Sequence, residues 1–156
     1  MNKYVLDTNI FNWILDGRIG TGDLPSDGLF FATPLQRAEI SVTADDERRR
    51  LLLSKLEEIA PSVLHAESFM FGVEGAGFDQ AKWSDGQTYP ALMALLDARR
   101  LRPSNVQDAL IAEVAFKNGM SLITADKILS EVAEGFGISV VFFSPDYVGV
   151  PNTQES

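Results

Sequence analysis

Four acidic residues stand at positions where a carboxylate adds little to the stability of a fold. Asp7 and Asp126 each close an apolar run, whereas Glu39 and Asp108 fall inside helical patterns. Carboxylates within a few ångströms of each other repel and raise one another's pKa values, and a hard divalent cation relieves that repulsion. If the fold brings the four together, they form a site for Mg²⁺ or Mn²⁺, which prefer oxygen ligands and can activate water for attack on a phosphodiester.

Asp108 is the most informative of the four. It lies in a predicted helix, 105–118, that is apolar over much of its circumference. We expect its carboxylate to be desolvated, which is costly unless the group is paired or bound to a metal. No lysine or arginine is an obvious partner nearby in the sequence.

Each acid also has an ordinary explanation. An aspartate between a strand and a helix is most often a helix cap, and Glu39 alone is most often part of a solvated helix face. Only the joint pattern favours a metal site. Three small polar residues beside the acids, Thr8, Asn9 and Thr124, could hydrogen-bond the carboxylates or a water on the metal. Thr8 and Asn9 are equally typical of a helix start, and Thr124 of a strand.

The composition limits the kinds of catalytic chemistry that the chain could carry out. The chain has 156 residues, 46% of them hydrophobic, which predicts one domain with a substantial core. It has no cysteine and one histidine, His65, which excludes thiolate chemistry and a catalytic histidine pair. The net charge of −9 argues mildly against a nonspecific nucleic-acid binder without excluding a nucleic-acid enzyme. With no membrane span or signal peptide in the pattern, we expect a cytoplasmic protein.

Strand and helix patterns alternate along the chain. This alternation predicts an α/β domain with a largely parallel sheet and helices on both faces, in which ligands bind beyond the carboxyl ends of the strands. The predicted strands are 3–6, 29–32, 121–124 and 139–143, and the predicted helices are 9–16, 34–41, 44–59, 90–99, 105–118 and 126–134.

Several boundaries follow from local signals. Thr43 with Asp46 three residues later suggests the start of one helix, and Ser104 with Gln107 suggests a capping box for another. Residues 62–71 fit either a strand or a helix. The glycine-rich stretch 72–89 is predicted to be a long loop that serves as a lid, a specificity loop or a partner-binding element. We expect one domain over 1–145 and a loose tail over 146–156.

The chain resembles the PIN-domain family, and within it the VapC-type toxins of toxin–antitoxin pairs. The segments that carry the resemblance are Val5–Ile10, Arg37–Ile40, Asp108–Ala112 and Leu122–Asp126. Their order and approximate spacing agree over about residues 3–143, which is most of the chain.

The resemblance implies a three-layer α/β/α PIN-like fold and a metal-dependent endoribonuclease. It assigns Asp7, Glu39, Asp108 and Asp126 as the acidic quartet that holds Mg²⁺ or Mn²⁺ and serves catalysis. It also implies a homodimer, a cognate antitoxin that covers the site, and a structured RNA substrate such as transfer or ribosomal RNA.

Basic and aromatic side chains offer weaker signals for RNA contact. For the arginines, solvated helix faces are the favoured explanation, and Trp13 fits a core or interface position better than a stacking role. The candidates for RNA contact are Arg37, Arg48, Arg49, Arg99, Arg102 and Trp83.

Two other functions remain open at this point. The chain could be a PIN-like fold retained as a protein- or RNA-binding module without turnover, although the four acids argue against that. It could also be a phosphotransfer or phosphatase domain with Asp7 as nucleophile. One large class of such enzymes has a second aspartate two residues later, where this chain has Asn9.

Overall fold

The computed structural model describes residues 2–60, 62–63 and 87–144. In this part of the chain, five parallel strands form one sheet in the order β3-β2-β1-β4-β5. The strands are β1 (Asn2–Leu6), β2 (Gly28–Ala32), β3 (Ser62–Val63), β4 (Ser121–Thr124) and β5 (Val140–Phe142).

The order of the strands reverses beside β1. From β1 the chain moves outward through β2 and β3, and it then returns to place β4 on the other side of β1. Tyr4 of β1 thus lies between Phe30 of β2 and Ser121 of β4. In an open α/β sheet, the carboxyl ends of the strands at such a reversal border a crevice that receives ligands. The reversal here lies between β1 and β4.

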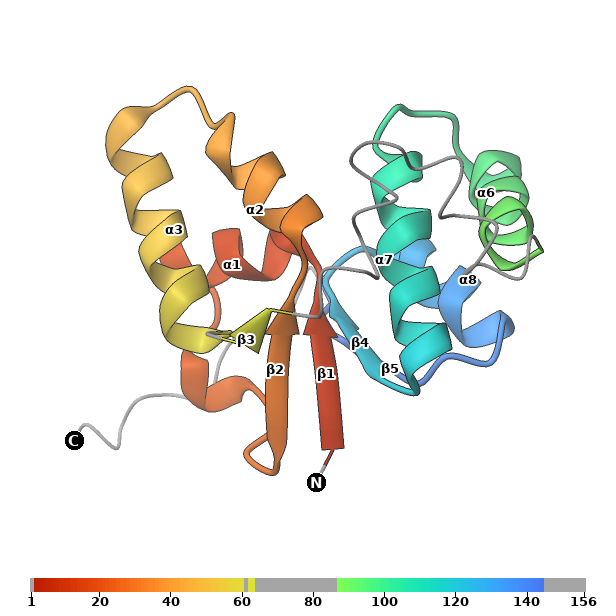
Figure 1. Cartoon of the computed structure of the whole chain (residues 1–156), viewed down its shortest axis with the longest axis horizontal. Helices are drawn as coiled ribbons and strands as arrows, with labels where there is room; N and C mark the ends of the chain where they lie inside the picture. Colours follow the sequence, from red (N-terminus) through yellow and green to blue (C-terminus); the bar gives the residue numbers. More distant parts are fainter. Residues whose placement is uncertain (1, 61, 64–86, 145–156) are drawn as a thin grey trace.

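Helices cover both faces of the sheet. Figure 1 shows α1, α2 and α3 on one side of the strands and α6, α7 and α8 on the other. The predicted three-layer α/β/α arrangement with a parallel sheet is therefore confirmed. The helices are α1 (Thr8–Leu15), α2 (Pro34–Ser41), α3 (Asp46–Ile59), α6 (Thr88–Arg99), α7 (Asn105–Asn118) and α8 (Lys127–Gly135), with a short 3₁₀ helix, η1 (Thr21–Asp23), before β2.

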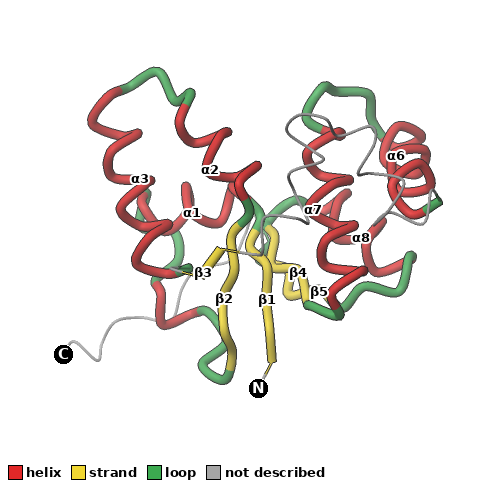
Figure 2. The backbone as a smooth tube through the Cα atoms, viewed as in Figure 1, coloured by secondary structure: helices red, strands yellow, loops and turns green. Residues whose placement is uncertain are grey.

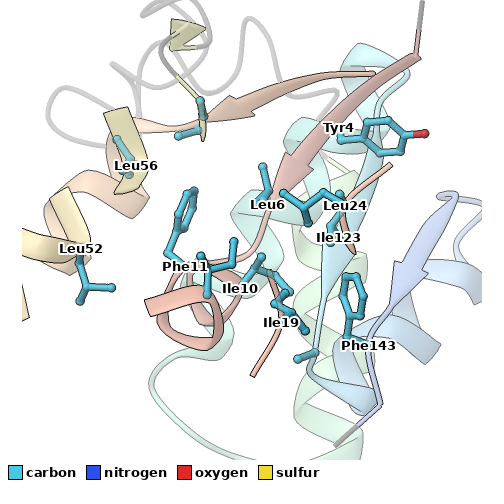
Figure 3. Packing of buried hydrophobic residues seen from close by; sticks show 14 of the residues in the cluster. Tyr4, Leu6, Ile10, Phe11, Ile19, Leu24, Leu52, Leu56, Ile123 and Phe143 are labelled. Atoms are coloured by element: carbon cyan, nitrogen blue, oxygen red, sulfur yellow. The ribbon is translucent and has the colours of Figure 1, made fainter. Parts of the chain in front are cut away.

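Two hydrophobic cores lie on the two faces of the sheet. Because side chains alternate along a strand, Val5 and Leu122 enter the core under α6, α7 and α8, whereas Leu6 and Ile123 enter the one under α1 and α3. Figure 3 shows the second core, where Phe11 lies among these residues. Each fully buried side chain of this size contributes roughly 1.5–3 kcal/mol, so both helical layers are held firmly to the sheet.

The predicted strands are confirmed, and two helix starts are corrected. Helix α6 begins at Thr88, ahead of Pro90, because the Gln87 carbonyl already accepts a 3.0 Å hydrogen bond from the Ala91 amide. Pro90 fits there because the first-turn amides of a helix have no partner within it. Helix α3 is capped by Asp45 instead of Thr43, since the Asp45 carboxylate accepts a 2.9 Å bond from the Arg48 amide.

The predicted capping box at Ser104 is wrong. Ser104 does precede α7, but its side chain makes no capping hydrogen bond. Its backbone is already helical, with φ −70° and ψ −7°, whereas a capping residue normally has an extended backbone that points its oxygen at the first amides. The other end of α7 is as expected, because Gly119 takes the left-handed conformation at φ 64° that a glycine adopts most easily.

Several predictions fall outside the described residues. These include most of the undecided segment 62–71, of which Ser62–Val63 is the strand β3, and the glycine-rich stretch up to residue 86. His65, Trp83 and the predicted tail 146–156 also lie there. Thr88 and Tyr89, predicted as the end of the long loop, belong to α6. Among the described residues, no helix is both long enough and apolar enough to span a bilayer.

Candidate functional site

Two of the four acids lie at the carboxyl ends of neighbouring strands. Asp7 directly follows β1 and precedes α1, and Asp126 follows β4 and precedes α8. The Asp7 amide continues the pairing of these strands by donating a 2.9 Å hydrogen bond to the Ile123 carbonyl. Because β1 and β4 are parallel neighbours, both carboxylates reach the edge of the sheet where the strand order reverses.

The two aspartates differ in how far a capping role explains them. Asp126 is a genuine cap of α8, since its Oδ1 accepts a 3.1 Å hydrogen bond from the Leu129 amide. Asp7 occupies the capping position of α1 but makes no capping hydrogen bond. Its Oδ2 instead accepts a 2.8 Å bond from the Thr124 hydroxyl on β4, and the residue is only 6% exposed. Helix capping therefore does not account for Asp7.

Asp108 approaches the same edge from the helical layer. It lies in the first turn of α7, which packs against β1 and β4, and it is 6% exposed. Burial raises its pKa, as expected from its apolar helix, and the nearby Asp126 carboxylate raises the pKa further. The guanidinium groups of Arg102 and Arg100 act in the opposite direction.

The pKa of Asp7 reflects both of the other aspartates. Burial is the largest influence on its pKa, followed by repulsion from Asp108, and Asp126 adds a smaller repulsion. Together they raise the pKa of Asp7 to about 7, against the hydrogen bond from Thr124, which lowers it. Asp7 is thus a buried carboxyl group that is partly protonated near neutral pH.

Glu39 is connected to the site through Thr8. It lies on α2, the helix that follows β2, and its Oε1 accepts a 2.6 Å hydrogen bond from the Thr8 hydroxyl. Thr8 is the residue after Asp7, so β2 and β1 carry Glu39 and Asp7 to adjacent positions in the fold. Glu39 is half-buried, and a fully solvated helix face does not describe it.

The small polar residues singled out in the sequence all contact this region. Thr124 donates to Asp7 and also accepts a 3.0 Å hydrogen bond from the Asp126 amide, so one hydroxyl connects two of the acids. The Asn9 side chain accepts a 3.4 Å hydrogen bond from the Ala125 amide, which ties the start of α1 to the end of β4. These contacts would fix the positions of the carboxylates.

Two arginines at the site were not foreseen as partners of the acids. The Arg100 guanidinium donates from Nη2 to Asp108 at 2.7 Å and from Nη1 to Asp126 at 2.8 Å. Arg102 contacts the same two carboxylates, at 3.2 Å and 2.8 Å. The expectation that Asp108 has no nearby cationic partner is therefore wrong. The spacing holds a usable signal, because both arginines lie within eight positions of Asp108 across a helix start.

A network on the connection between α6 and α7 holds Arg100 in place. Figure 2 shows this connection as a short loop between the two helices. Arg100 Nε donates a 3.2 Å hydrogen bond to the Asn105 side chain, which itself donates at 2.8 Å to the Arg100 carbonyl and to Asp97. The Arg100 side chain is only 15% exposed, so it is held inside the site by these contacts.

The other arginines proposed for RNA contact have carboxylate partners away from the acids. Arg37 pairs with Glu57, Arg48 with Asp16, Arg49 with Asp46, and Arg99 with Glu131. Arg48 also donates a 2.8 Å hydrogen bond to Asn12, which ties α3 to α1. These pairs fit the solvated-face interpretation. Trp13 packs on the second core and carries Arg18 over its ring, 3.8 Å from the centroid.

The donors present suit a hard divalent cation, although they are not arranged as a finished set of ligands. All are carboxylate or hydroxyl oxygens, as Mg²⁺ and Mn²⁺ prefer, and the raised pKa of Asp7 shows that its negative charge is incompletely compensated. Within the described ranges, however, no three histidine, cysteine or acidic side chains are already grouped so that they could hold one ion. The pairing of Asp108 and Asp126 with arginines is consistent with that finding.

The chain is similar in structure to solved proteins that include the following three. VapBC2 from Rickettsia felis, bound to a promoter DNA fragment, matches with a TM-score of 0.54 and 14% identity over 91% of this chain and 99% of the other. VapBC-5 from Mycobacterium tuberculosis matches with a TM-score of 0.53 and 20% identity, over 92% and 99%. A domain of a functionally unknown protein from Methanocaldococcus jannaschii matches with a TM-score of 0.50 and 17% identity, over 96% of each chain.

These matches cover nearly the whole of each chain, and they confirm the PIN-like fold that the sequence predicts. Sequence comparisons find less. No protein-family profile matches the chain, and no curated protein matches it either.

Proposed function

We propose that this chain, which has the PIN-like fold of the VapBC structures, is a metal-dependent endoribonuclease and the toxin of a toxin–antitoxin pair. The observation that carries the proposal is the convergence of Asp7, Asp108 and Asp126 where the order of the strands reverses. A cognate antitoxin, a homodimeric assembly in the cytoplasm and a structured RNA substrate such as transfer or ribosomal RNA belong to the same proposal.

The acidic residues would hold Mg²⁺ or Mn²⁺. Asp7, Asp108 and Asp126 are the ligands we propose, with Glu39 as a further ligand next to Thr8. When bound, the metal would supply Lewis acidity toward an attacking water and toward the oxygen that leaves the phosphodiester. Such chemistry needs carboxylates that face one another, and the repulsion of Asp7 by Asp108 and Asp126 supports that arrangement.

The chain's own groups would share the remaining work. One of the acids would also accept a proton from the attacking water. The Thr124 hydroxyl holds Asp7 through Oδ2 and holds the backbone of Asp126 at the same time. Arg100 keeps Asp108 and Asp126 at a fixed spacing from the buried side.

Cleavage of a structured RNA tests the proposal. The purified protein should cut an RNA hairpin or transfer RNA in the presence of Mg²⁺ or Mn²⁺, and a chelator should stop the reaction. Asp7→Asn and Asp108→Asn should each remove activity while their circular dichroism spectra keep the native form. Asp46→Asn is the control, because Asp46 is an exposed acid on α3 outside the site. Full activity in either Asp7→Asn or Asp108→Asn would contradict the assignment.

One observation favours a second function. Arg100 and Arg102 already neutralise Asp108 and Asp126, as expected if the fold now serves as a non-catalytic protein- or RNA-binding module. A calorimetric titration with Mn²⁺ separates the two functions. Binding that requires Asp7 supports the nuclease, whereas no binding up to millimolar Mn²⁺ supports the module.

A further inference from the structure

The two arginines at the acidic site differ in how firmly they are held. Arg100 is 15% exposed and also bonds Asn105, whereas the Arg102 side chain is 44% exposed. Both contacts of Arg102 with the acids come from a single nitrogen, Nη2. Opening a buried pair leaves an uncompensated charge and is strongly unfavourable, whereas opening an exposed pair changes the free energy little. Arg102 is therefore the arginine whose side chain can move away from the carboxylates of Asp108 and Asp126.

The position of Arg102 lets its side chain move while the backbone stays. The residue lies in the connection between α6 and α7, and its carbonyl accepts a 3.0 Å hydrogen bond from the Asn105 amide at the start of α7. The flanking Leu101 is 83% exposed, so this connection faces solvent. A rotation of the Arg102 side chain would free one oxygen contact on each of Asp108 and Asp126 without disturbing either helix.

A divalent ion and the Arg102 guanidinium need the same carboxylate oxygens. Oδ2 of Asp108 and Oδ2 of Asp126 accept from Arg102, and these oxygens would be ligands of the metal in the proposed function. A guanidinium that is released from carboxylates has a planar set of donors that suits a phosphate equally well. Its backbone anchor would keep it at the edge of the site where a phosphodiester must lie.

We propose that Arg102 exchanges partners: it neutralises Asp108 and Asp126 when no metal is bound, and it binds a phosphate of the RNA once a divalent ion has taken those carboxylates. This inference rests on the proposed function. It makes Arg102 a competitor of the metal and a partner of the substrate. The two roles have opposite consequences when the side chain is removed.

The test compares Arg102→Gln with a closely matched control. Arg99→Gln removes the same charge three positions away, from a side chain that is also 44% exposed but pairs with Glu131. Mn²⁺ affinity is measured by calorimetry, and KM and kcat are measured on an RNA hairpin at saturating Mn²⁺. Arg102→Gln should bind Mn²⁺ roughly threefold more tightly or better, since an exposed ion pair is removed, and should show a clearly raised KM. Arg99→Gln should leave the Mn²⁺ affinity unchanged.

Arg102→Lys serves as the conservative variant. It keeps the charge near Asp108 and Asp126 but lacks the planar fork, so it should restore Mn²⁺ affinity to the wild-type value and recover KM only partly. Weaker Mn²⁺ binding in Arg102→Gln would show a purely structural role and overturn the inference. Equal Mn²⁺ binding in wild type, Arg102→Gln and Arg99→Gln would also overturn it and leave the proposed nuclease standing. If no variant binds Mn²⁺, both fail together.

Discussion

The Thr124 hydroxyl donates a 2.8 Å hydrogen bond to Asp7, a residue 117 positions earlier in the chain. The same oxygen accepts the amide of Asp126, so Thr124 sets the relative positions of two acids that β1 and β4 deliver separately. The contact is buried and needs both the parallel pairing of these strands and their register. A carboxylate fixed from outside its own element is typical of a site that has a required geometry.

Replacing Thr124 by valine should weaken the acidic site and the fold together. The substitution keeps the shape but leaves Asp7 and the Asp126 amide without their common partner, which costs about 1–3 kcal/mol for buried groups. Urea unfolding should show that loss, and a Mn²⁺ titration should show reduced affinity. Thr124→Ser, which keeps the hydroxyl, should stay near wild type in both measurements. Equal Mn²⁺ affinity in the valine and serine variants would rule out a role for Thr124 in positioning the acids.

The raised pKa of Asp7 predicts a specific dependence of stability on pH. The carboxyl group titrates near pH 3.8 when unfolded and near 7 when folded. The folded state therefore holds the proton more tightly, and this contribution to stability is complete below about pH 4 and is lost as the pH rises toward 7. At most it is on the order of 4 kcal/mol, from 1.36 kcal/mol for each unit of pKa.

Comparing wild type with Asp7→Asn isolates this effect, because the amide does not titrate. With a chelator present, the stability of Asp7→Asn relative to wild type should rise between pH 4 and pH 7 and then level off. Unfolding in urea at a series of pH values measures the difference. A difference that stays constant from pH 4 to pH 8 would mean that the pKa of Asp7 is not raised.

Much of the fold could be read from the sequence because the local patterns agree with the tertiary structure. The apolar runs of β1 and β4 are buried on both faces, and α7 ends at Gly119 as expected. Asp7 and Asp126 could be placed at one edge from the rule for parallel strands alone. The apolar residues of α7 around Asp108 likewise predicted a desolvated carboxylate, and Asp108 is buried in the structure.

The parts that could not be predicted depend on contacts across a turn. Arg100 and Arg102 precede α7 within eight positions of Asp108, but this spacing alone does not show that the connection folds back to bring them onto both Asp108 and Asp126. The cap of α3 was misplaced for a similar reason, since Thr43, Asp45 and Asp46 are all acceptable caps by type and only the backbone path selects Asp45. The catalytic and metal-binding roles of the acids remain predictions.

Arg100 should matter far more for stability than its neighbour Arg99. Arg100→Gln breaks two partly buried ion pairs and leaves Asp108 and Asp126 with only the exposed Arg102, so we expect a loss approaching the roughly 3–5 kcal/mol of a broken buried pair. Arg99→Gln opens one exposed pair with Glu131 and should change stability little. Thermal or urea unfolding of both variants provides the comparison. Similar losses in the two would show that Arg100 is not a structural brace.

Gly28 offers a test of the sheet that leaves the acids untouched. A Cβ at this position would collide with the ring of Tyr4, which is buried and stacks on Phe30 at 5.6 Å. Gly28→Ala should therefore lower stability by about 1–3 kcal/mol through overpacking, with unchanged Mn²⁺ affinity. Gly22→Ala is the matched control, because a Cβ there meets no atom within 4 Å. A stability of Gly28→Ala equal to that of Gly22→Ala would contradict the packing of Tyr4.

Calorimetric titration of wild type and Asp7→Asn with Mn²⁺ at pH 7.5 is the most direct test of whether the buried acids form a metal centre. Asp7→Asn should bind Mn²⁺ at least tenfold more weakly than wild type. In the absence of metal, it should unfold at a urea concentration equal to or higher than that of wild type. This combination separates a ligand from a structural residue, whose loss would reduce stability as well. Equal Mn²⁺ affinity in the two proteins, or no Mn²⁺ binding by either, would contradict a metal centre at Asp7.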